Sequence, residues 1–150
     1  MDAEVYPDER VAQFINRNFV SITTHIKENK EAFGRFGAQW TPTLIVLDSE
    51  GKEQYRFEGY LPPEDFLAQL EMGLARSAFE RGGFPEAERR YREIAQKYPK
   101  SEVAAEALYW AGVSKYKATN DPAPLKQADR ELKERYPESS WAKKASVWGG

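Results

Sequence analysis

Two patterns of hydrophobic and polar positions divide this chain of 150 residues near its middle. Up to about residue 60, apolar residues stand in short runs between glycine, proline and polar turns, as in strands that alternate with short helices. From residue 63 onward they recur every three or four positions over long stretches, as on amphipathic helices. The pattern therefore predicts an α/β part over residues 1–70 and an all-α part over residues 71–150.

The strongest strand signal is the apolar run 44–47, which follows directly on Pro42 and Thr43. Four aliphatic residues without alternation predict a strand that is covered on both faces. A polar turn over 48–52 then leads into the alternating segment 53–59, so the two segments are expected to form a β-hairpin.

The residues before this run predict two short helices with a strand between them. Residues 7–16 carry acidic residues first and three apolar residues on one helical face. Residues 19–26 are rich in β-branched and aromatic side chains, which favours a strand. A second short helix is expected over 29–36, closed by Gly37.

The helical part contains an internal repeat. Residues 98–104 and 136–142 share the pattern Tyr-Pro-x-Ser-x-x-Ala, which indicates a repeated helical unit. Apolar faces and breaks at glycine and proline predict helices over residues 63–81, 85–98, 102–118, 122–135 and 140–147. The last of these is expected to act as a cap, because a stack of repeats needs its terminal face covered.

Charge and composition exclude several classes of partner. The 22 basic and 24 acidic residues are interspersed and give a net charge of −2, so neither nucleic acid nor an anionic membrane is an expected partner. No apolar run reaches the about 18 residues that a membrane helix needs. The first residues lack the features of a signal peptide, so the chain as written is expected to be cytoplasmic.

The residues that carry most catalytic chemistry are scarce. The chain has no cysteine, which removes disulfides, thiolate nucleophiles and cysteine zinc sites. Its one histidine, His25, is expected to bond locally or to face solvent. The turn carboxylates show no spacing typical of a metal cage or a catalytic dyad. We therefore expect no catalytic residue, no metal and no cofactor.

Residues 40–60 resemble the C-terminal half of the thioredoxin fold. The likeness lies in Pro42 at the start of a core strand, the hairpin turn that ends near Gly51, and Gly59 before the closing helix. The resemblance implies a cis peptide bond between Thr41 and Pro42.

The same resemblance suggests a peptide-binding ledge. In thioredoxin relatives the residue before the cis-proline presents its backbone to an extended peptide, so Trp40, Thr41 and Pro42 are candidate binding residues. The alternative, which the lack of cysteine favours, is that Pro42 only shapes the start of the strand and Trp40 lies in the core.

The resemblance also implies that a strand is missing. In the related subfamily a Cys-x-x-Cys motif lies just before a segment like residues 1–11. The strand that leads to this motif lies in the sheet between the two strands that correspond to residues 19–26 and 44–47. Two strand edges would then lack main-chain partners. Three outcomes are open: the two strands pair directly, two chains pair as a homodimer through these edges, or the sequence comes from a longer protein. We favour the last as the origin.

The helical part resembles tetratricopeptide (TPR) repeats. The residues at the family's characteristic positions are Leu74, Ala75, Gly82, Ala87, Tyr91 and Pro99. In the second unit Gly112 takes the small helix-crossing position, but Leu125 replaces the usual alanine and residues 120–124 lengthen the turn.

The TPR resemblance implies a concave groove for a peptide. Its candidate residues are Arg76, Phe79, Tyr109, Val113 and Tyr116, since tyrosines and an arginine suit peptide recognition. Aromatic residues at helical spacing are more often core, so packing against the thioredoxin-like part is the alternative.

We therefore expect an incomplete thioredoxin-like sheet with a cis-proline hairpin, followed by TPR-like helical hairpins. The first functional hypothesis is a non-catalytic protein-interaction module whose partner is a protein or peptide. The alternative is the C-terminal part of a thioredoxin-like thiol–disulfide oxidoreductase whose redox motif lies upstream of Met1.

Overall fold

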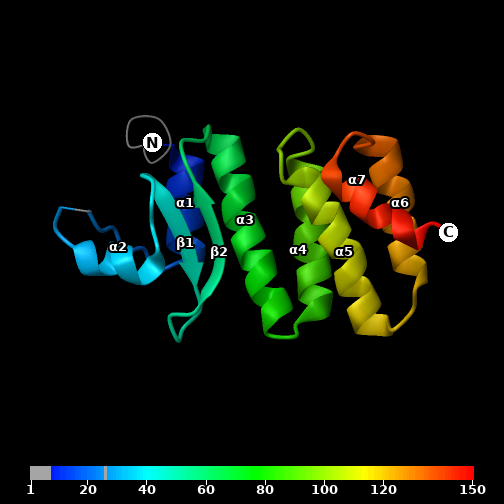
Figure 1. Ribbon diagram of the computed structural model, residues 1–150, viewed down its shortest axis with the longest axis horizontal. Coiled ribbons are helices and arrows are strands. Elements are labelled where there is room, and N and C mark those ends of the chain that lie inside the picture. Colours follow the sequence, from blue (N-terminus) through cyan, green and yellow to red (C-terminus); the bar gives the residue numbers. More distant parts are fainter. Residues whose placement is uncertain (1–7, 26) are drawn as a thin grey trace.

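The computed structural model describes residues 8–25 and 27–150. Figure 1 shows helices α3 to α6 following one another along the long axis, with a small sheet at one end and α7 near the other. The elements are α1 (Glu9–Asn18), α2 (Lys30–Phe36), β1 (Thr43–Leu47), β2 (Glu53–Glu58), α3 (Pro63–Glu80), α4 (Phe84–Lys97), α5 (Ala104–Thr119), α6 (Ala123–Arg135), α7 (Ser140–Ala145) and the 3-10 turn η1 (Ser146–Trp148).

Strands β1 and β2 form the predicted antiparallel hairpin. The Asp48 carboxylate accepts hydrogen bonds from the main-chain N–H groups of Glu50 and Lys52, each at 2.9 Å, and Gly51 adopts a φ of 81°. A positive φ of this kind favours glycine, which explains the residue found in this turn. The peptide bond between Thr41 and Pro42 is cis, as the thioredoxin resemblance implied.

The prediction that β1 is covered on both faces is wrong. Only Val46 is buried in this strand, while the Leu47 side chain is 39% exposed. Helix α3 packs against one face of the hairpin so closely that a Cβ added at Gly73 would lie 2.7 Å from Val46 Cγ2. The opposite face stays partly open.

The strand predicted over residues 19–26 is also not formed in the described residues, which here end at His25. The segment follows α1 as irregular chain, with Val20 94% and Ile22 89% exposed. Among the residues that the structure describes, β1 pairs only with β2, so direct pairing with 19–25 does not occur. Strand formation needs a partner for the main-chain groups, and local propensity supplies none.

Helix α3 belongs to both parts of the molecule. Near its start, Phe66 and Leu70 pack with Val11 and Phe57 of the α/β part. Further along, Met72, Ala75 and Ala78 pack with the buried residues of α4 and α5. Residues 66–73 are all buried, so one continuous helix lies inside two cores.

A chain of polar contacts adds to this junction. The Tyr55 hydroxyl of β2 donates to Gln69 Oε1 of α3, and Gln69 Nε2 donates to Glu102 Oε1 at 3.1 Å. Tyr98, the residue that ends α4, packs against both cores. The sheet is therefore tied to the helical part by side chains from β2, α3 and α4.

The predicted helices of the second part are confirmed, with ends that shift by one or two residues. The predicted cap over 140–147 is instead the short helix α7 followed by η1. Gly112 of α5 lies against α6, which confirms its predicted place at the helix crossing: a Cβ built there would lie 2.6 Å from Ala128 Cβ. None of the helices in the described ranges is both long and apolar enough to cross a bilayer.

Candidate functional site

Five aromatic side chains from α3, α5, α7 and η1 form a connected set, which we call the aromatic row. They are Phe79, Tyr109, Trp110, Trp141 and Trp148. The ring centroids of Phe79 and Trp110 lie 5.4 Å apart, and those of Tyr109 and Trp141 lie 5.0 Å apart. Trp148 stacks on Tyr109 at 4.6 Å with an interplanar angle of 28°. These are the distances and tilts at which aromatic pairs attract.

Two cations already lie on the rings of this row. The guanidinium carbon of Arg76 is 4.8 Å from the centre of the Trp110 ring, and Lys144 Nζ is 3.9 Å from the centre of the Trp141 ring. Arg76 also forms an ion pair with Glu80, with Nε and Oε1 3.1 Å apart. The ring faces therefore act as electron-rich surfaces for positive charge.

A half-buried carboxylate, Glu106, lies beside the row on α5. Burial raises the pKa of the Glu106 carboxyl, while a hydrogen bond from the Trp110 side chain and the charges of Arg76 and Lys144 lower it in part. Among the described residues, no basic nitrogen lies within 4.0 Å of this carboxylate. The described residues therefore compensate its negative charge only in part.

The structure brings together three of the groove residues expected from the sequence. Arg76, Phe79 and Tyr109 all belong to or touch the aromatic row. Tyr116 and Val113 are half-buried further along α5 and make none of the ring contacts that join the row. The contacts within the row join α3, α5, α7 and η1 rather than the sheet.

Four residues of this site were not predicted from the sequence: Trp110, Trp141, Trp148 and Glu106. One signal was available, because Trp110 and Trp148 stand at equal distances after the two Tyr-Pro pairs. Nothing in the periodicity indicates that η1 would place Trp148 against Tyr109. That contact depends on the fold of the last turn.

The thioredoxin-like ledge is exposed, which contradicts the alternative that Trp40 lies in the core. The Trp40 side chain is 66% exposed, and Pro42 is half-buried. The carbonyl of Trp40 accepts a hydrogen bond from the Thr43 hydroxyl, and that of Pro42 accepts one from Gly59 N–H at 2.9 Å. Two carbonyls of the ledge are thus already bonded within the chain, whereas the side chain of Trp40 remains exposed.

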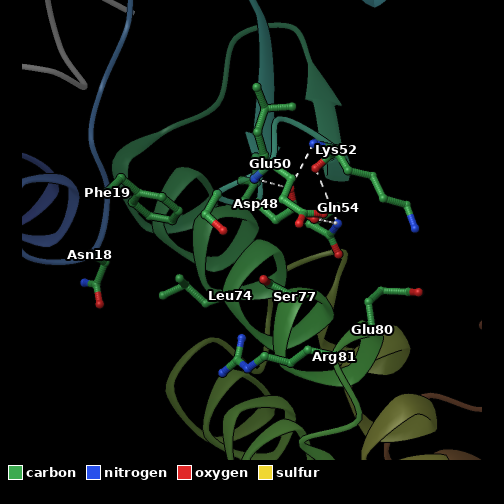
Figure 2. Close-up of a pocket in the computed structure, with 13 residues that line it drawn as sticks. Asn18, Phe19, Asp48, Glu50, Lys52, Gln54, Leu74, Ser77, Glu80 and Arg81 are labelled. Atoms are coloured by element: carbon green, nitrogen blue, oxygen red, sulfur yellow. Dashed lines mark hydrogen bonds between the residues drawn. The ribbon is translucent and has the colours of Figure 1, made fainter.

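A surface hollow of about 480 Å³ lies between the end of α1, the β1–β2 turn and the second half of α3. Figure 2 shows the turn residues around Asp48 facing Leu74 and Ser77 of α3. Phe19, Val46 and Leu74 supply apolar lining, and charged groups of both signs surround it. Within the described part of the chain, no cluster of three or more histidine, aspartate or glutamate side chains could hold a metal.

Two family models match successive parts of the chain. Residues 1–73 match the family model of a thioredoxin-like domain, and residues 69–101 match that of a tetratricopeptide repeat. No curated protein and no solved structure matches the chain. The two matched ranges overlap within α3, the helix that lies inside both cores.

Proposed function

Because the chain joins a thioredoxin-like domain to a tetratricopeptide repeat through one shared helix, we propose that it is a non-catalytic protein-interaction module. The partner segment would lie across α3, α5 and α7, on the aromatic row. The exposed Trp40 ring, with Thr41 and Pro42, is proposed as a second, smaller contact for a peptide.

The observation that carries this proposal is the composition of the row. Aromatic and arginine side chains contribute most of the binding energy at many protein interfaces, and tyrosine and tryptophan bury large areas at low cost in side-chain entropy. Here three such residues, Tyr109, Trp110 and Trp141, are only partly buried although they lie next to a closed helical core. The partial exposure of these aromatic side chains supports a binding surface for a partner.

Site-specific photo-crosslinking tests the proposal. A benzophenone amino acid at position 116 should form a covalent adduct with a partner in cells of the natural source, because this position lies two helical turns after Tyr109 and hence on the same side of α5 as that member of the row. The matched control is position 89 of α4, an arginine whose side chain is 57% exposed and which lies outside the row. Mass spectrometry of the adducts is the measurement. Equal adducts at both positions, or none at 116, would contradict the proposed binding face.

A second proposal concerns the edge of β1 that pairs with no other strand in the described residues. Two chains would associate as a homodimer through this edge and the exposed segment 20–24. Neither stretch contains a charged residue, so their approach brings no like charges together. Exposed, uncharged strand edges of this kind pair readily with other strands.

The dimer proposal predicts a mass of twice 17.2 kDa by light scattering coupled to size exclusion. Replacing both Val20 and Ile22 by lysine should return the mass to that of one chain, because charges at a strand edge block pairing. Val147→Lys is the control, since this valine is 79% exposed but lies at the far end of the chain. A wild-type protein that stays monomeric at all concentrations rules the dimer out.

The oxidoreductase alternative also follows from the thioredoxin-like match. Thiol–disulfide exchange requires a thiolate, and these 150 residues contain no cysteine, so the redox motif of that alternative would have to lie upstream of Met1. An open reading frame that encodes Cys-x-x-Cys directly upstream would support it. The interaction-module proposal does not require such a motif.

A further inference from the structure

The aromatic row indicates the chemistry of its partner through the charges that surround it. Glu106 is half-buried, and among the described residues no basic nitrogen lies within 4.0 Å of it. Removing a carboxylate from water without a close counter-ion is costly, and a partner that brings a cation recovers part of that cost. This carboxylate therefore favours a positively charged ligand.

The rings favour a cation for an independent reason. Arg76 and Lys144 show that the faces of Trp110 and Trp141 attract positive groups at 4.8 and 3.9 Å. An arginine side chain suits such a surface best, since its flat guanidinium stacks on rings and donates two parallel hydrogen bonds to a carboxylate.

The same two cations could instead attract an acidic partner, but their charges are already engaged. Arg76 is paired with Glu80 at 3.1 Å, and Lys144 Nζ lies 3.9 Å from the centre of the Trp141 ring. Glu102 is a further carboxylate close to Glu106. Around Glu106, the carboxylates of Glu80, Glu102 and Glu106 thus stand against the two cations Arg76 and Lys144, and a negative ligand would add to the excess.

We propose that the aromatic row binds an arginine or lysine side chain of the partner segment, with Glu106 as its counter-ion. This rests on the proposed function and adds the chemical class of the partner. The cation lies against the indole rings, and the flanking apolar residues of the partner segment cover the remaining ring surface.

Three short peptides test the inference. The probe is the acetylated and amidated sequence Ala-Phe-Arg-Leu-Ala, and its two counterparts carry citrulline or glutamate in place of arginine. Citrulline keeps the shape and most donors of arginine but lacks the charge. The indole N–H signals in a proton–nitrogen NMR titration report binding, and the main-chain amide signal of Arg89 on α4, which lies outside the row and the ledge, is the internal reference.

The arginine peptide should shift the indole signals of Trp110, Trp141 and Trp148 and leave the amide signal of Arg89 unchanged. It should bind about tenfold more tightly than the citrulline peptide, as expected for one charge-assisted contact with a stacked cation. The glutamate peptide should bind most weakly.

The variant Glu106→Gln should remove the preference for arginine over citrulline without lowering the melting temperature. Burial already disfavours the charged form of this side chain, so the neutral amide of the same shape is tolerated. Glu93→Gln on α4 is the matched control, because this glutamate pairs with Arg89 away from the row, and it should keep the preference.

Each other outcome is informative. Equal binding of the arginine and citrulline peptides, or a preference that survives Glu106→Gln, overturns the inference while the shifted indoles still support a peptide-binding row. Tightest binding of the glutamate peptide overturns it in favour of an acidic partner. If none of the three peptides shifts the indoles of the row, both this inference and the proposed binding face are wrong.

Discussion

Phe66→Ala lowers the free energy of unfolding by about 3–5 kcal/mol, the cost typical of removing a fully buried phenylalanine side chain. Phe66 has no exposed surface, and its ring meets that of Phe57 edge to face at 5.5 Å. Its neighbours Leu67 and Leu70 lie in the same cluster on α3. The neighbouring side chains of α3 cannot easily move into the cavity, because this helix is packed between two cores.

The loss should reach both parts of the molecule, because α3 lies inside both cores. Hydrogen exchange followed by mass spectrometry is the measurement. Protection of the β1–β2 hairpin and of helices α4 and α5 should fall together in the variant. Loss of protection in the hairpin alone would show that the two parts unfold separately and that α3 does not couple them.

Val147→Ala is the matched control for this prediction. It also shortens an apolar side chain, but Val147 is 79% exposed and lies outside the proposed dimer interface. Truncating an exposed side chain leaves no cavity, so the free energy of unfolding should change by less than about 0.5 kcal/mol. A comparably large loss of stability at this exposed position would show that the effect of Phe66→Ala is not specific to the buried cluster.

Gly112→Ala destabilises the protein by about 1–2 kcal/mol, although alanine is the better helix former. The added Cβ would lie 2.6 Å from Ala128 Cβ and 3.2 Å from the carbonyl oxygen of Pro124. Carbon atoms in contact normally lie about 3.5–4.0 Å apart, so α5 and α6 must separate by roughly 1 Å. Overpacking of this kind costs about 1–3 kcal/mol, and the gain in helix propensity returns up to about 1 kcal/mol.

Gly34→Ala is the control with the opposite expected sign. Gly34 lies within α2, and a Cβ built there meets no atom within 4 Å. The substitution should therefore leave the stability unchanged or raise it by up to about 1 kcal/mol. Urea denaturation of both variants measures the difference. A similar change in both would mean that the α5–α6 crossing is not as close as described.

The features that depend on neighbouring residues in the chain were predictable from the sequence. Helices α3 to α6 follow from apolar positions three and four residues apart and from breaks at Gly82 and Pro85. The β1–β2 hairpin follows from its turn residues, because Asp48 and Gly51 determine the turn by themselves. The groove candidates Arg76, Phe79 and Tyr109 were found by their place in the repeat.

The features that need a partner distant in the chain were decided only by the tertiary structure. Residues 19–25 have the composition of a strand but do not form one, because a strand needs the main-chain groups of a second segment as hydrogen-bond partners. The aromatic row likewise exists only because η1 turns Trp148 back onto Tyr109 of α5. Local periodicity fixes which face of a helix is apolar, whereas long-range packing decides what that face meets.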